Sequence, residues 1–286
     1  MAAFDPGRIP DNLKQAYREK RCAVLVGAGA SMGAGLPSWG TLLSSMIDEA
    51  RGHRVIDDAK VADYRKLVAD PSKYLMVAGG LKEDFAAYFD EFVVKTFIEP
   101  KPRPTELHQT LTKADRLQFV LTTNYDTLLE QAYRASGMYD VAVCTFLDSG
   151  EIQRRLSKRE FFILKAHGDA SRVGNGIVLT EMDYRDIVYR QRAYQSLLSA
   201  MFTMFTIIFV GASMTDPEIK LLLSYISDVF ATTSGPSHFA LMAEEDTTGV
   251  ERERWFKDMK VQLVPVSKAN DYEEVTQFIE ALHASA

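Results

Sequence analysis

Six short runs of apolar residues recur along this 286-residue chain, and each run ends in small or polar residues. Uninterrupted apolar runs of this kind are typical of strands that are buried on both faces, as in parallel sheets. The runs occupy residues 22–26, 118–122, 161–165, 206–210, 238–242 and 261–265. Helical patterns lie between them, at residues 38–51, 127–135, 193–205, 216–226 and 271–282. This alternation predicts an α/β fold with a doubly wound, mostly parallel, Rossmann-like sheet.

The pattern changes between residues 52 and 104, where apolar residues recur at helical spacing and no strand run is present. Pro100, Pro102 and Pro104 close this segment, because proline cannot continue a helix. We therefore predict one domain over residues 1–286 with a helical insertion at residues 52–104. The insertion is our candidate for an assembly surface.

The composition is that of an ordinary globular protein, with 47% hydrophobic and 25% charged residues. No apolar run approaches the roughly 20 residues of a membrane span, and the N-terminus has no basic start followed by an apolar core. The formal net charge of -6 argues against a surface dedicated to nucleic acid. Cys22 and Cys144 are too few for a disulfide framework. We expect a cytoplasmic protein with no membrane and no direct nucleic-acid binding.

A glycine-rich turn, Gly27-Ala28-Gly29-Ala30-Ser31, follows the first apolar run and precedes a helical start. Glycines allow a backbone to approach a diphosphate, and free N–H groups at a helix N-terminus attract its charge. The turn departs from the dinucleotide fingerprint, because Met32 stands at the third glycine position. The acidic residue that usually binds the ribose is also missing. The alternative interpretation is a tight turn in which the small residues are needed only for packing.

Polar or glycine-rich residues follow three further strand runs. Asn124 and Asp126 come after the second, His167 after the third, and Gly211 after the fourth, where Asp216 precedes a helix as a predicted N-cap. Because ligands bind outside the carboxyl ends of strands in open α/β sheets, these residues predict one shared cleft. Each also has a structural alternative, since an isolated Asn or Asp often caps a helix and a histidine can lie satisfied in a core.

These motifs, taken in order, resemble the sirtuin-like family, and most closely its bacterial branch in anti-phage defence. The resemblance rests on GAGAS at 27–31 with GLPSW at 35–39, TTNYD at 122–126, HGD at 167–169 and FVGASMTDPEI at 209–219. The motifs span most of the chain, and the ordered set is more specific than the glycine turn alone. The resemblance implies NAD as the bound substrate.

The binding residues that the resemblance implies come from the first and last motifs. Gly27-Ala28-Gly29 would hold the NAD diphosphate, and Ser31 would lie beside it. Gly211 and Ser213 would contact the adenosine half. No metal is implied, because the four-cysteine zinc module of protein-deacylating sirtuins has no counterpart after His167.

The catalytic residues that it implies are Asn124, Asp126 and His167. Asn124 would hold the nicotinamide ribose or a water beneath it, Asp126 would meet the nicotinamide carboxamide, and His167 would serve as general base. Cleavage of the nicotinamide–ribose bond builds positive charge on the ribose, and nicotinamide leaves as a neutral molecule, so the reaction needs no strong general acid. His108 is a weaker candidate, near a helix start, for which a structural role is the commoner one.

The expected function is therefore NAD hydrolysis to nicotinamide and ADP-ribose, which would deplete cellular NAD during anti-phage defence. Thr123, Ser38 and Trp39 also depart from the pattern of the deacylating sirtuins, and the missing zinc module puts the acyl-lysine groove in doubt. The alternatives are an NAD-dependent protein deacylase and a non-catalytic subunit that senses NAD or ADP-ribose. The resemblance also implies a homo-oligomer and a separate partner protein, such as a HerA-type ATPase or an Argonaute-like protein.

Overall fold

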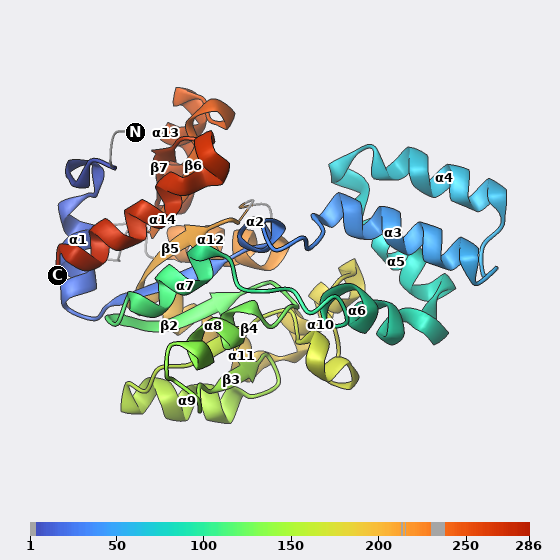
Figure 1. Cartoon of the computed structure of the whole chain (residues 1–286), viewed down its shortest axis with the longest axis horizontal. Helices are drawn as coiled ribbons and strands as arrows, with labels where there is room; N and C mark the ends of the chain where they lie inside the picture. The colour runs from blue at the N-terminus through green and yellow to red at the C-terminus, as the bar shows by residue number, and fades with distance from the viewer. Residues whose placement is uncertain (1–3, 213, 215, 230–237) are drawn as a thin grey trace.

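A seven-stranded parallel sheet forms the centre of the computed structural model, which describes residues 4–212, 214, 216–229 and 238–286 (Figure 1). The strand order is β3-β4-β2-β1-β5-β6-β7. The strands are β1 (Cys22–Val26), β2 (Leu117–Thr122), β3 (Val143–Thr145), β4 (Ile163–Lys165), β5 (Thr206–Val210), β6 (His238–Ala243) and β7 (Val261–Val266). The predicted doubly wound parallel sheet is confirmed.

The central strand β1 is buried on both faces, which explains its uninterrupted apolar sequence. Val24 and Val26 belong to the hydrophobic cluster on one face, and Ala23 and Leu25 belong to the cluster on the other. In the parallel register, Val26 lies level with Thr122 of β2 and with Val210 of β5. The chain segments that leave these three strands therefore emerge side by side.

Helices cover both faces of the sheet. Those that contribute to the first cluster are α1 (Asp11–Arg18), α7 (Glu106–Lys113), α8 (Leu128–Ala135) and α14 (Ala269–Ala284). Those that pack on the second are α9 (Ser149–Lys158), α10 (Glu181–Arg190), α11 (Arg192–Met204), α12 (Pro217–Val229) and α13 (Gly249–Met259). The carboxylate of Asp216 accepts the amide of Ile219 at 3.1 Å, which confirms the predicted cap of α12. Within the described ranges, no helix is long and apolar enough to cross a membrane.

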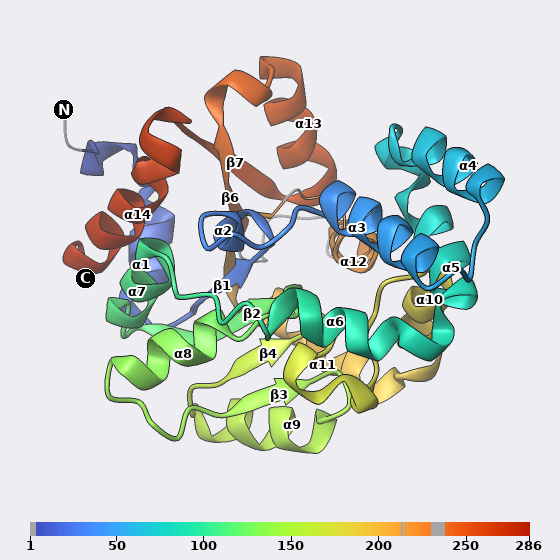
Figure 2. The same cartoon turned by 45° about the vertical axis from the view of Figure 1, so that its right-hand side comes forward.

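A third hydrophobic cluster is formed mainly by the helices between β1 and β2, which lie together to one side of the sheet, with Leu128 of α8 and residues after β4 packed against them (Figure 2). They are α3 (Trp39–Gly52), α4 (Asp58–Val68), α5 (Tyr74–Asp84) and α6 (Phe89–Phe97). Helices thus fill the stretch between β1 and β2, and α3 shares their core through Leu43 and Ile47, while their interpretation as an insertion into the sheet domain stays a prediction. The boundaries 52–104 and the description of the chain as one domain stay predictions.

The sequence expectation was wrong at one edge of the sheet. Strand β3, of three residues, was not predicted, and β4 begins at Ile163, two positions later than expected. Cys144 pairs with Leu164 in this edge ladder. A strand of three residues is too short to show an apolar run or an alternation.

Candidate active site at the carboxyl ends of the strands

The glycine turn packs directly on the backbone that leaves β5. The amides of Gly27 and Gly29 donate to the carbonyls of Val210 and Gly211, both at 2.9 Å. A Cβ atom on Gly27 would lie 2.6 Å from the Cα of Ala212. Gly211 has φ +61°, and a Cβ there would lie 2.5 Å from the amide nitrogen of Ala30. These glycines are needed for a close approach of two backbones, so the packing role considered from the sequence is real.

The helix after the turn, α2 (Gly29–Met32), has four residues, and a helix this short carries only a small dipole. The amides of Ala30 and Ser31 donate to the carbonyls of Gly27 and Ala28 at 3.1 and 3.0 Å. Four amides of the turn are therefore bonded within the protein. Binding of a diphosphate by Gly27-Ala28-Gly29 stays a prediction.

Three predicted site residues, Ser31, Asn124 and Asp126, form one hydrogen-bonded group, which we call the Asn124 cluster. The amide Nδ2 of Asn124 donates to the Ser31 hydroxyl at 3.1 Å and to the Gly27 carbonyl at 3.0 Å. The Ser31 hydroxyl in turn donates to Oδ2 of Asp126 at 2.8 Å. All three side chains are buried. The structure thus joins the loop after β2 to the glycine turn after β1.

The loop after β2 owes its shape to side-chain bonds with the backbone. The Thr122 hydroxyl donates to the Val26 carbonyl at 2.8 Å and accepts the amide of Asn124 at 3.0 Å. Oδ1 of Asp126 accepts the amide of Leu128, the first residue of α8, at 3.0 Å. Asp126 therefore also fills the capping role that was considered from the sequence, while its second oxygen binds Ser31.

His108 lies buried beside this cluster. Its Nδ1 accepts the amide of Thr105, the N-cap of α7, at 3.3 Å, so in the neutral ring the proton is on Nε2. That Nε2 atom is buried and has no hydrogen-bond partner among the described residues. Burial lowers the pKa of His108 against the opposing effect of the Asp126 carboxylate. The sequence favoured a structural role for His108, and its bond to the Thr105 amide at the start of α7 is a structural contact.

His167 belongs to a second group, the His167 cluster, together with Tyr184, Asp216 and Glu218. Its Nε2 lies 3.4 Å from Oδ2 of Asp216 and 3.7 Å from Oε2 of Glu218, which are ion-pair distances and longer than good hydrogen bonds. Tyr184 donates to the same Asp216 oxygen at 2.9 Å and packs edge-on against the imidazole. No hydrogen bond between His167 and Asn124 is present in the part of the chain that the structure describes.

The two carboxylates control the charge of His167. Burial alone lowers the pKa of an imidazole, yet the negative charges of Asp216 and Glu218 outweigh it and raise the pKa of His167 above its ordinary value. The ring therefore holds its proton more firmly than a free imidazole. A general base must first lose that proton, so this site is poised toward higher pH.

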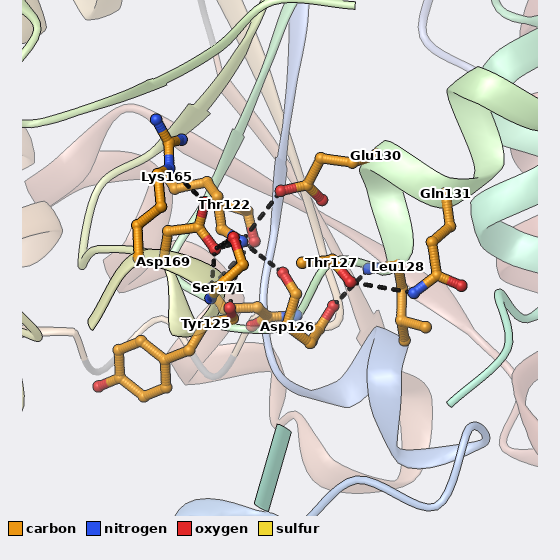
Figure 3. Close-up of polar contacts among 12 residues, drawn as sticks. Thr122, Tyr125, Asp126, Thr127, Leu128, Glu130, Gln131, Lys165, Asp169 and Ser171 are labelled. Atoms are coloured by element: carbon orange, nitrogen blue, oxygen red, sulfur yellow. Dashed lines mark hydrogen bonds and ion pairs between the residues drawn. The ribbon is translucent and has the colours of Figure 1, made fainter. Parts of the chain in front are cut away.

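Sequence reasoning missed a buried lysine between the two groups. Lys165, the last residue of β4, has a side chain with 0% exposure. Its Nζ binds Oε1 of Glu130 at 3.0 Å, Oδ1 of Asp169 at 3.1 Å and the carbonyl of Tyr125 at 3.1 Å (Figure 3). In the sequence, a lysine after an apolar run simply marks the end of the strand. Its partners lie on a helix and in a loop that come together only in the folded structure.

The remaining predicted site residues differ in what the structure says of them. Ser213 lies outside the described residues. Gly211 borders the glycine turn, as described above.

A cavity of about 420 Å³ lies elsewhere, between α5 and α10. It is lined by Leu75, Met76, Gly79, Lys82, Glu83, Ala86, Thr180, Glu181, Met182 and Asp183. Among the residues with described positions, no group of three or more His, Cys, Asp or Glu side chains is placed to hold a metal ion.

Comparison with known proteins gives several matches. The chain is 25% identical over 276 residues to a protein named NAD(+) hydrolase ThsA from Bacillus cereus, covering 92% of this chain and 54% of that protein. It is 24% identical over 216 residues to defense-associated sirtuin 2 from Bacillus subtilis, covering 75% of this chain and 20% of the relative. The chain thus spans about half or less of these relatives' length.

A solved structure described as a Sir2 homolog–NAD complex aligns with 97% of this chain and 96% of its own, at 14% identity and a TM-score of 0.48. A family model described as the SIR2-like domain matches residues 118–264. This match contains the Asn124, His167 and Asp216 motifs and covers just over half of the sequence. The resemblance that the motifs indicated is confirmed, and the chain belongs to the SIR2-like family.

Proposed function

We propose that this chain cleaves the nicotinamide–ribose bond of NAD and releases nicotinamide and ADP-ribose. The observation that carries the proposal is the position of the buried Asn124 amide, which is bonded to Gly27 and Ser31 at the carboxyl ends of β1 and β2. In the sheet, β1 lies between β2 and β5, so the strand order runs in opposite directions on its two sides. The carboxyl end of β1 is therefore the switch point of the sheet, where such folds bind ligands. The relatives named NAD(+) hydrolase support this choice.

The reaction needs a held nicotinamide, a stabilised ribose cation and an oriented water. In our proposal Asn124 holds the water or the ribose, because an amide can both donate and accept. Asp126 contacts the carboxamide, and His167 in its neutral form takes the proton of the attacking water. The diphosphate lies along Gly27-Ala28-Gly29 beside Ser31, and the adenosine half lies near Gly211 and Ser213.

The test is the release of nicotinamide from NAD by purified protein, followed by liquid chromatography. The Asn124→Ala and His167→Ala variants should each lose most of the turnover, while Asn12→Ala, on the exposed side of α1, should keep it. Wild-type turnover in the double variant Asn124→Ala, His167→Ala would show that the assignment is wrong. Deacylation of mixed acyl-lysine peptides, measured in parallel, separates the deacylase alternative from hydrolysis.

In the cell, the proposed activity would deplete NAD in the cytoplasm when phage infection triggers it. The relative named defense-associated sirtuin 2 supports this setting. We further propose that the chain forms a homo-oligomer through the helical insertion at 52–104 and acts with a separate partner, a HerA-type ATPase or an Argonaute-like protein. Light scattering of the purified chain tests the first point. Nicotinamide release with and without the products of neighbouring genes tests the second.

A further inference from the structure

The buried Lys165 ammonium connects two loops that carry different parts of the candidate site. On one side, it donates to the carbonyls of Tyr125 and Asp126, at 3.1 and 2.5 Å, in the loop that holds the Asn124 cluster. On the other side, it donates to the carboxylate of Asp169, two residues after His167. The amide of Ala170 adds a backbone bond between the same loops, to the Tyr125 carbonyl at 2.9 Å. Figure 3 shows Lys165 together with Tyr125, Asp126 and Asp169, its partners in the two loops.

Two cations and two carboxyl groups meet around Lys165. Lys165 contacts Glu130 and Asp169, and Arg172 Nε lies 3.0 Å from Oδ2 of Asp169. Burial raises the pKa of Glu130 and outweighs the opposing effect of the Lys165 ammonium. Burial opposes ionisation of Asp169, but the Lys165 ammonium and the Ser171 donors hold its pKa below the usual range. The Asp169 end of the connection is therefore an ion pair at neutral pH.

Stability alone gives little reason for this arrangement. Replacing a buried ion pair with apolar side chains of similar volume is often neutral or stabilising, because two charges must be taken out of water. What a lysine offers at this position is three donors on a long stem, which are shared among two carbonyls and two carboxyl groups. An apolar residue would fill the space without fixing the loops relative to each other.

We propose that Lys165 is a positioning residue that sets the separation between Asn124 and His167 across bound NAD. The inference rests on the proposed hydrolysis of NAD. Asn124 and His167 lie in the loops that follow two neighbouring strands, β2 and β4, but belong to separate groups of polar side chains, and Lys165 contacts the loop of each. Misplacement of a catalytic group by about 1 Å costs roughly 100-fold in rate, so the connection acts on turnover more than on binding.

The test compares Lys165→Met with Lys82→Met. Lys82 is a control with similar contacts, because its Nζ also bridges a carboxylate, Asp183 at 2.8 Å, and a carbonyl, Ile177 at 3.0 Å. It joins α5 to the start of α10, and its side chain is 27% exposed, so the two variants are compared at equal melting temperature. We expect Lys165→Met to lower kcat by roughly 10- to 100-fold with a change in KM for NAD below about threefold. Lys82→Met should leave both constants near wild type. Equal effects of the two substitutions, or a loss confined to KM, would overturn the proposal.

A second pair of variants keeps the test valid if Lys165→Met does not fold. Asp169→Asn weakens the link to the His167 loop, whereas Glu130→Gln weakens only the link to α8, on the Asn124 side. A positioning role predicts a larger loss of kcat in Asp169→Asn than in Glu130→Gln at equal melting temperature. Losses of kcat that simply follow the melting temperature of each variant would contradict it.

Hydrogen exchange provides a readout that does not depend on catalysis. In Lys165→Met or Asp169→Asn, peptides covering residues 123–128 and 166–171 should both exchange faster, and in Lys82→Met neither should. If the wild type releases no nicotinamide either alone or with the products of neighbouring genes, the proposed function fails, while the exchange data still test the connection. If exchange in both loops is unchanged, the connection fails whatever the activity.

Discussion

The Gly27→Ala substitution tests whether the two strand ends at the site must touch. The added Cβ would lie 2.6 Å from the Cα of Ala212, 2.6 Å from the carbonyl oxygen of Gly211 and 3.0 Å from the Cβ of Ala212. Two of these atoms belong to the backbone and cannot rotate aside, so β1 and β5 must separate locally. Overpacking of this kind costs about 1–3 kcal/mol. For a chain of this size, that corresponds to a fall in melting temperature of about 2–6 °C.

Because the amides of Gly27 and Gly29 bond to the carbonyls of Val210 and Gly211, the same separation should disturb the turn beside Asn124. We therefore expect a raised KM for NAD in nicotinamide release as well as the lower melting temperature. The control is Gly79→Ala in α5, where a Cβ meets nothing within 4 Å. In a helix that change stabilises by about 0.4–1 kcal/mol. Gly27→Ala with the melting temperature and KM of wild type would refute the reasoning.

Three further predictions concern the chemistry. Because only the neutral ring accepts a proton, kcat/KM should rise with pH through the raised pKa of His167. Asp216→Asn removes one cause of that raised pKa and should move the rise to lower pH. An unchanged pH profile in this variant would contradict the ion pair. Ser31→Ala removes the hydroxyl that donates to Asp126 and accepts from Asn124. Urea denaturation should show a free energy of unfolding lower by about 1–3 kcal/mol, and turnover should fall. Full turnover in this variant would exclude Ser31 from the site. Nicotinamide leaves as a neutral molecule, so a chelator such as EDTA should leave turnover unchanged, and a loss restored by a divalent metal would contradict the scheme.

The ion pair of His167 also links stability to pH. Its folded-state pKa lies above that of a free imidazole, so the pair stabilises the protein fully below the ordinary imidazole value. That contribution is lost as the pH rises through the raised folded-state pKa. The pH range in which His167 becomes a base is therefore also the range in which its pairing with Asp216 weakens.

The fold was largely predictable because the central strands are buried on both faces. β1 and β5 agree with their predicted bounds, since each is a largely apolar run that ends at a glycine, Gly27 or Gly211. Strand β3 could not be predicted, because Val143–Thr145 is short and lies at the sheet edge, where its pairing with β4 decides its conformation. The helices α4 and α6 were indicated by periodic apolar residues, whereas α5 contains Gly79 and Gly80 and was not singled out.

The candidate site was predictable where polar residues directly follow strands. Ser31, Asn124 and Asp126 do meet, as expected from the parallel order of β1 and β2. The attachment of His167 to Asp216 and Glu218 was not predicted, because nothing in a linear pattern says which of two strand ends a buried carboxylate faces. Lys165 was missed for a similar reason: its partners lie 35 and 4 residues away and on different elements.

The position of β1 in the middle of the sheet has a consequence for synthesis on the ribosome. Its partner β5 begins at Thr206, so one edge of β1 stays unpaired until most of the chain has been made. Such late, non-local pairing is slow to form and leaves a strand edge open to aggregation. The hydrogen bonds from the amides of Gly27 and Gly29 also cannot form until Val210 and Gly211 have been synthesised. A nascent chain therefore cannot complete the glycine turn, or any activity that depends on it, before residue 211 has left the ribosome.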